Sequence, residues 1–166
     1  MNGFFEALRR GRLTGARAAD GRVLVPPREY DPATGEPIEE LVELPPVGVV
    51  TSWSWVPEPA PHHPLDRPFA WALIRLEGAS TDLMHAVDAG DAERMRAGMA
   101  VQARWSQAPS GGILDLACFV PAEDAESEPA PPEPEGPLKG LRAPTRLVYT
   151  VSADASRDRF LRGLAE

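Results

Sequence analysis

The side chains that could act as nucleophiles or metal ligands are few, and they stand apart in this sequence. Cys118 lies in the apolar stretch 115–120 with no histidine near it, which is typical of a buried, inert thiol. His62 and His63 are adjacent in a proline-rich segment without a third ligand, so a solvated loop is favoured over a metal site. The sequence contains no phosphate-binding glycine loop, no Gly-x-Ser-x-Gly and no His-Glu-x-x-His. We therefore expect no enzymatic activity from this chain alone.

His85 is the remaining titratable candidate. It lies in an apolar stretch, 83–87, with Asp88 three residues further on. A general base needs a substrate pocket beside it, and the sequence indicates none. A structural or partner-contact role is therefore favoured over catalysis.

Four tryptophans form the other notable set: Trp53, Trp55, Trp71 and Trp105. Trp53 and Trp55 should lie on the same side of a strand, because alternate strand residues share a face. Such side chains could stack on bases or on an adenine ring. A place in the core or in a subunit interface, where tryptophan is enriched, is favoured instead.

The charge of the chain is distributed unevenly. The formal net charge is −8 over 166 residues, but residues 122–136 hold six acidic residues, four prolines and no base. The remaining 19 acidic residues nearly balance the 17 basic ones. A near-neutral body with an acidic segment argues against a nucleic-acid binder, which needs a positive surface.

The sequence also indicates the cellular compartment in which the protein resides. A single cysteine excludes an internal disulfide framework and a cysteine-rich metal site. No apolar run reaches the roughly 18 residues of a membrane span. The first residues lack the basic-then-apolar order of a secretory signal, so we expect a cytoplasmic protein.

The elements that position these residues begin with a short helix in the segment 1–11. Phe4, Phe5 and Leu8 share one face at helical spacing, and Gly11 suits the C-terminal cap. A helix this short is marginal alone, so it must dock on the body of the chain or on another subunit. Residues 12–40 are rich in turn signals, with a strand candidate at 23–25.

Residues 41–121 have an all-β pattern. Strands are predicted at 47–56, 69–76, 82–87, 99–105 and 113–120, with a helical turn at 91–96. In the first of them, Val49, Thr51, Trp53 and Trp55 are expected on one face. Five short strands with one helical interruption favour a small Greek-key barrel of the OB type over a seven-stranded sandwich. The predicted fold class is therefore mainly β.

The rest of the chain divides into two segments. Residues 122–144 are predicted to be an extended acidic linker, because they cannot bury enough apolar surface to order. In 145–166, residues 146–151 resemble a strand, and Phe160, Leu161 and Leu164 repeat the order seen around Phe4. This repeat indicates the start of a second unit, with chance amphipathicity as the alternative, and residue 166 need not be a natural end.

The order of these features resembles a known family. An amphipathic helix is followed by Gly-Arg-Leu and by a segment that contains Val25-Pro26-Pro27-Arg28. A barrel and a final Phe119-Val120-Pro121 follow it. The chain is similar in this to the OB-fold proteins of domain of unknown function 35 (DUF35), which pair a rubredoxin-like zinc ribbon with an OB-fold. We call residues 12–40, which correspond to a degenerate zinc ribbon, the knuckle. The matching stretches cover most of residues 4–121. Tandem members exist with a degenerate first unit, which agrees with the repeat.

The chain departs from this family at the zinc ribbon. Relatives carry two Cys-x-x-Cys pairs, where this chain has 17–21 and 31–35. The degenerate ligand positions are Ala18, Asp20, Asp31 and Thr34. Tetrahedral zinc normally takes thiolate or imidazole donors, so we predict no metal and no cofactor. The Asp31 side chain can close the second turn without one.

The resemblance implies a role as an accessory subunit of a thiolase-like enzyme of the lipid-transfer or aldolase type, in lipid or steroid metabolism. Such a subunit binds its partner and helps to shape the acyl-CoA site. Candidate partner contacts are Phe4, Phe5, Leu8, Trp53 and Trp55, and candidate acyl-CoA contacts are Trp71, Arg75 and His85. A stand-alone acyl-CoA or nucleotide-binding module is the alternative. The acyl-CoA, the pathway and the stoichiometry with the partner stay open.

Overall fold

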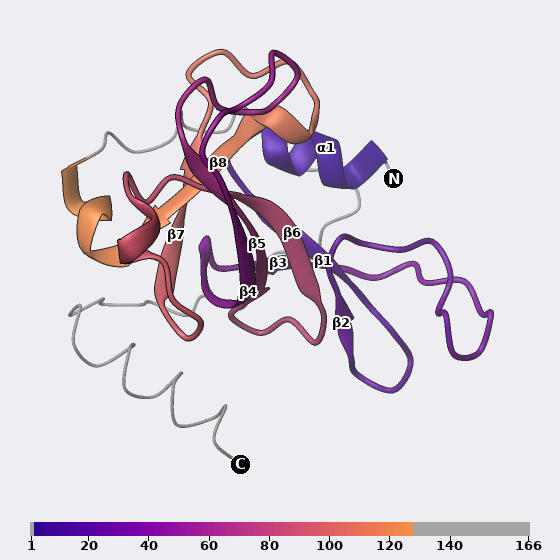
Figure 1. Cartoon of the computed structure of the whole chain (residues 1–166). Coiled ribbons are helices and arrows are strands. Elements are labelled where there is room, and N and C mark those ends of the chain that lie inside the picture. The colour runs from indigo at the N-terminus through magenta and orange to yellow at the C-terminus, as the bar shows by residue number, and fades with distance from the viewer. Residues whose placement is uncertain (1, 128–166) are drawn as a thin grey trace.

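The chain folds into a short helix, a small three-stranded sheet and a closed five-stranded barrel (Figure 1). The computed structural model describes residues 2–127. The predicted strand 146–151 and the repeat around Phe160 lie outside them. The helix and strands are α1 (Asn2–Arg9), β1 (Leu13–Arg17), β2 (Val23–Leu24), β3 (Leu41–Leu44), β4 (Val47–Val56), β5 (Phe69–Leu76), β6 (Asp82–Val87), β7 (Ala100–Trp105) and β8 (Leu116–Pro121). Three short 3-10 helices are η1 (Ala92–Arg94), η2 (Ile113–Asp115) and η3 (Ala122–Ser127).

The barrel has the strand order β4-β5-β6-β8-β7, and β4 closes it by pairing with β7 as well as with β5. Neighbouring strands are antiparallel except β6 and β8, which are parallel and share the bridge between Val87 and Phe119. This arrangement is that of a five-stranded Greek-key OB-fold. The predicted mainly β fold class is therefore confirmed.

A second sheet precedes the barrel, in the order β2-β1-β3. The turn-rich pattern of residues 12–40 accounts for β2 and for the loops, but it did not reveal β1 or β3. Strands of five and four residues give too few alternations for a period of two to stand out. Pairing makes them strands, since four residues of β1 face four residues of β3 across the ladder.

The predicted face of β4 is wrong because of a β-bulge at Thr51. The register with β5 pairs Val50 with Ile74 and then Ser52 with Leu73, so Thr51 is an extra residue. An extra residue reverses the side to which the following side chains point. Val50 therefore belongs to the same core cluster as Trp53 and Trp55, whereas Val49 is buried outside that cluster and Thr51 is exposed.

The last barrel strand also begins later than predicted. Residues 113–115 form η2, and β8 starts at Leu116. The acidic segment does not begin as an extended linker either, since η3 follows β8 directly. Arg94 of η1 anchors η3 through its guanidinium, which lies 3.2 Å from Glu123 and 2.7 Å from Asp124. Arginine pairing orders this first turn of an acidic sequence.

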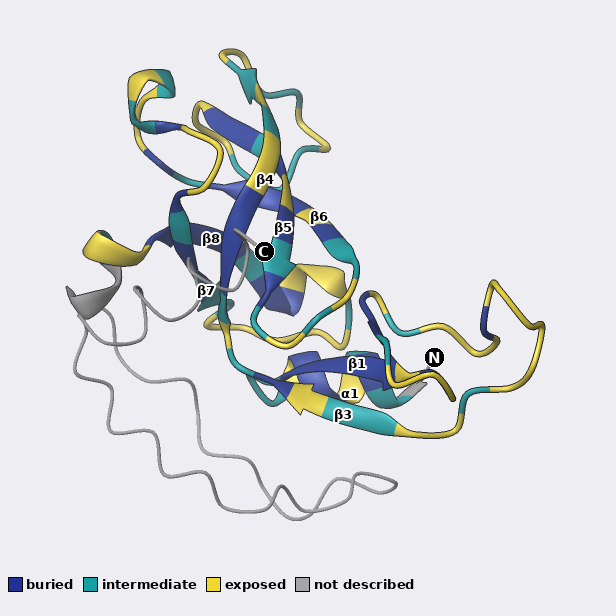
Figure 2. Ribbon diagram, turned by 90° about the horizontal axis from the view of Figure 1, so that it is seen from below, coloured by how far each residue is buried: buried dark blue, intermediate teal, exposed yellow. Residues whose placement is uncertain are grey.

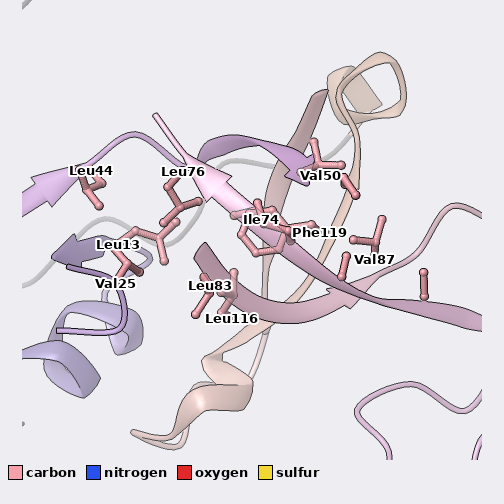
Figure 3. Close-up of a cluster of buried hydrophobic side chains, with 14 of the residues drawn as sticks. Leu13, Val25, Leu44, Val50, Ile74, Leu76, Leu83, Val87, Leu116 and Phe119 are labelled. Atoms are coloured by element: carbon pink, nitrogen blue, oxygen red, sulfur yellow. The ribbon is translucent and has the colours of Figure 1, made fainter. Parts of the chain in front are cut away.

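One hydrophobic core joins the helix, the small sheet and the barrel (Figure 3). Leu13 of β1 and Leu44 of β3 lie toward the barrel residues Leu76 and Ile74 in this view. Helix α1 contributes Phe4 and Leu8 to the same core. Figure 2 shows the buried residues concentrated in β1 and the barrel strands, with exposed residues mainly in the loops.

A second, smaller core lies under the proline-rich loop 57–68. Phe69, Ala86, Cys118 and Val120 are buried there, and Leu65 of the loop packs on them. The ring of His63 stands edge-on to Phe69 at 5.6 Å, and its Nδ1 accepts a hydrogen bond from the Ala60 N–H at 3.1 Å. The prediction of a buried Cys118 is thus confirmed, and His63 packs inward instead of being part of a fully solvated loop.

Candidate functional site

Two of the three partner-contact candidates on α1 lie in the core of the chain itself. Phe4 is 4% exposed and Leu8 is 1% exposed. The helix docks on β1 and on η2, so the question of where it packs is answered within the chain. Phe5 is only partly buried, with its ring 5.6 Å from that of Phe4. Of the three, Phe5 alone keeps substantial surface for another subunit.

Trp53 and Trp55 are half-buried on the inner side of β4. They stand opposite Ala72 and Ala70 of β5, whose small side chains leave room for the indoles against the core. The two tryptophans therefore share a face, as the spacing predicted. Each is partly a core residue and partly open to a neighbour.

The three candidate acyl-CoA contacts are not brought together. Trp71 and Arg75 lie on the outer face of β5 with Leu73 between them, since alternate residues share a face. His85 of β6 pairs with Ala72 and faces the interior, where it is 4% exposed. Trp71 and Arg75 therefore lie on the outer surface of the barrel, and His85 lies in its interior.

The charge of Arg75 is neutralised by a carboxylate. Its Nε donates to Asp82, the residue opposite it on β6. Asp82 also accepts a hydrogen bond from the Thr51 hydroxyl at 2.8 Å. A phosphate group would have to compete with this network for the guanidinium. The geometry therefore gives no support to a nucleotide site at Arg75.

His85 is held in an apolar environment. Its ring lies 5.9 Å from that of Phe119 and close to the backbone of Ile113. Burial lowers the pKa of the imidazole to about 4. Asp88, the acid three residues on, pairs instead with Arg67 at 2.5 Å. His85 is thus a neutral interior residue at physiological pH.

The degenerate ligand positions of the knuckle lie in two tight turns that an arginine joins. Arg22 donates to Asp20 at 2.5 Å and to Asp31 at 3.2 Å, and the first bond lowers the pKa of the Asp20 carboxyl. Asp31 also accepts from the Ala33 N–H at 2.8 Å, which confirms the predicted side-chain turn. The Thr34 hydroxyl caps the Glu36 N–H at 3.3 Å.

These residues do not fit a zinc ion. Ala18 has no donor atom, and both carboxylates are already bound to a guanidinium. Within residues 2–127 no three His, Cys, Asp or Glu side chains gather closely enough to hold a metal. Zinc sites need four well-placed donors, normally sulfur or nitrogen.

Sequence reasoning missed the apolar residues on the outside of the barrel. Leu73 of β5 is 40% exposed and Met84 of β6, directly opposite it, is 65% exposed. Both strands are apolar on their two faces, so no alternation distinguishes the inner residues from the outer ones. The signal that could have revealed them is the continuous apolar run 69–74, which is unusual for the outer wall of a small barrel.

The comparisons with known proteins agree with this architecture. Residues 41–106, from β3 through the end of β7, match the sequence model of the family described as "ChsH2, C-terminal OB-fold domain". A solved structure named "Ltp2-ChsH2(DUF35) aldolase" has a chain of 28% identity, aligned over 72% of this chain and 91% of that one, with a TM-score of 0.54. This chain is similar to the OB-fold proteins of the DUF35 family.

A DUF35 protein of unknown function from Sulfolobus solfataricus is also similar in structure. Its identity is 23%, with 60% of this chain and 73% of that one aligned and a TM-score of 0.48. None of the curated proteins matches the chain. Within residues 2–127 of the chain, no helix has the length and apolarity that crossing a bilayer demands.

Proposed function

We propose that this chain is a non-catalytic accessory subunit that binds a thiolase-like enzyme of lipid metabolism and helps to shape its acyl-CoA site. The observation that carries the proposal is the similarity to the DUF35 chain of the Ltp2–ChsH2 aldolase, which this chain matches over 91% of that chain's length. Because the alignment spans nearly the whole of a chain that occurs in such a complex, this chain has the elements needed for the same kind of assembly.

The placement of the reactive residues supports a non-catalytic role. His85 and Cys118 are both buried, 4% and 1% exposed, so neither can reach a substrate in this conformation. Asp20, Asp31 and Asp82 are bound to arginines. The carbon–carbon chemistry would then belong to the partner, and this chain would contribute surface and stability.

Co-expression tests the proposal. The partner to use is the thiolase-like enzyme, encoded by the same genome, whose sequence is most similar to Ltp2. We expect a stoichiometric complex on size-exclusion chromatography with light scattering, and an enzyme activity on acyl-CoA that this chain raises. Absence of a complex, or turnover of acyl-CoA by this chain alone, would overturn the proposal.

Calorimetry with acetyl-CoA distinguishes the alternative of a stand-alone binding module. Because Arg75 is paired with Asp82, we expect the isolated chain to bind acetyl-CoA no more tightly than about millimolar. Micromolar binding by the isolated chain would favour the alternative over the accessory role.

A further inference from the structure

Most of the large apolar side chains that are exposed come from the barrel strands β5 and β6 and from η2. Within residues 2–127, five large hydrophobic residues are exposed, and four of them come from three adjacent elements: Leu73 of β5, Met84 of β6, and Ile113 and Leu114 of η2. The fifth, Tyr30, lies in the loop after β2. We call these four residues the outer apolar face. Scattered apolar residues are normal on a surface, but a cluster indicates an interaction site.

The members of the outer apolar face are connected through the barrel. Leu73 and Met84 are direct partners across the β5–β6 ladder. The backbone of Ile113 in η2 lies close to the His85 ring of β6. η2 leads directly into β8, the neighbour of β6 in the barrel, so the four residues belong to β5, β6 and the segment that enters β8. Figure 1 shows η2 next to α1 at one end of the barrel, where the two elements contact each other.

The position of this face in the fold is that of a ligand surface. β5 and β6 are the second and third strands of the OB barrel, and η2 lies in the loop between the fourth and fifth strands. OB-folds bind their ligands over the face of the second and third strands and through this loop. In this chain that surface carries aliphatic side chains and a methionine.

The charges that border the face are paired. Arg75 is bound to Asp82 at one end of the β5–β6 ladder, and Arg67 is bound to Asp88, 2.5 Å away, at the other. A nucleic acid or a phosphate would need unpaired cations here. The outer apolar face is thus neutral, and the charged residues beside it are already bound to each other. An uncharged, apolar protein surface is complementary to such a face.

We propose that the outer apolar face is the surface on which the thiolase-like partner docks, through an uncharged, apolar segment of that enzyme. This inference rests on the proposed function and adds to it the contact surface. Met84 and Leu73 are its central contacts, because they stand in the middle of the sheet face and η2 borders them.

The test uses the full chain co-expressed with the partner named above. The variants are Met84→Glu and Leu73→Asp, and the matched control is Tyr30→Glu, which adds a charge at a residue 62% exposed elsewhere on the surface. Loss of a central contact should weaken binding by about tenfold or more, measured by calorimetry, whereas the control binds as the wild type does. Met84→Leu should retain the binding.

A second measurement does not depend on the folding of the variants. Oxidation of Met84 by hydrogen peroxide in the wild-type protein should slow when the partner is bound, while the buried Met95 and Met99, each 5% exposed, serve as internal references. Slower oxidation of Met84, followed by mass spectrometry, supports the proposal.

The outcomes separate this inference from the proposed function. If the wild type binds the partner and the charged variants bind equally tightly, or if Met84 is oxidised at the same rate in the complex, the surface assignment is overturned while the accessory role stands. If the wild type does not bind the partner, the proposed function itself fails.

Discussion

His85 illustrates how burial fixes the chemistry of one side chain. The imidazole is 4% exposed and rests against Phe119. The two acids three residues away, Asp82 and Asp88, are paired with Arg75 and Arg67 and do not stabilise a charged ring. Burial therefore lowers the pKa of His85 from 6.5 to about 4. The residue that looked most like a general base is held in the neutral state by the core.

This depressed pKa predicts a pH-dependent stability. The unfolded chain takes up a proton near pH 6.5 and the folded chain only near pH 4, so the contribution of His85 is complete above pH 6.5 and is lost as the pH falls to 4. The shift corresponds to about 3 kcal/mol of unfolding free energy. Urea denaturation at a series of pH values measures it.

The variant His85→Gln isolates this contribution, since glutamine keeps a hydrogen-bonding group but does not titrate. We expect the difference in unfolding free energy between wild type and variant to shrink between pH 6.5 and pH 4. The exposed His62→Gln is the control, with a profile parallel to that of the wild type. A pH-independent difference for His85→Gln would show that the folded protein accepts the proton easily.

At the scale of elements, the sequence predicted the long strands and missed what tertiary pairing creates. The strands 47–56, 69–76 and 82–87 were correct to the residue, because each is a mostly apolar run bounded by turn residues or prolines. β1 and β3 exist through their ladder with each other. The bulge at Thr51 has no sequence signal, and it reversed the face on which Trp53 and Trp55 were placed relative to Val49.

For the candidate site, too, the features within one strand were predictable from the sequence, whereas the contacts between elements were not. Trp71 and Arg75 share one face of β5, but the Asp82 that neutralises Arg75 comes from another strand, which no pattern within β5 could reveal. Local patterns likewise could not show that α1 docks on its own chain, which buries Phe4 and Leu8. Residue patterns predict what an element is, and the pairing of elements decides which of its residues remain accessible.

The two turns of the knuckle give a prediction at this scale. Asp31, 3% exposed, both caps the Ala33 N–H and pairs with Arg22 of the first turn. Asp31→Ala should lower the unfolding free energy by about 1–3 kcal/mol, since it leaves the Ala33 N–H without its acceptor and Arg22 with Asp20 alone. Asp31→Asn keeps an acceptor for the Ala33 N–H, and its smaller loss measures the ion pair, which solvent weakens at the half-exposed Arg22.

A second measurement tests whether a bound metal ion stabilises the knuckle. If the arginine and the turns hold it, a chelator such as EDTA leaves the thermal midpoint of the wild type unchanged, and purified protein carries no stoichiometric zinc by elemental analysis. A midpoint that falls with chelator, or an Asp31→Ala variant as stable as the wild type, would contradict this account of the knuckle.

For the whole molecule, the shared core implies that helix, small sheet and barrel unfold together. Phe4 and Leu8 of α1, Leu13 of β1 and Leu44 of β3 belong to the same cluster as Ile74 and Phe119 of the barrel. All four tryptophans lie in barrel strands, so their fluorescence reports on the barrel and not on the helix. A substitution in α1 therefore tests the coupling directly.

Leu8→Ala removes a side chain that is 1% exposed, and it should lower the unfolding free energy by about 2–4 kcal/mol. Because the core is continuous, the urea midpoint followed by tryptophan fluorescence should fall by the same amount as that followed by the circular dichroism of the backbone. The exposed Arg9→Ala on the same helix is the control, with an effect within about 0.5 kcal/mol. If Leu8→Ala leaves the tryptophan midpoint in place while amides of 2–17 lose protection from hydrogen exchange, the helix and its sheet are a separate unit that the barrel does not need.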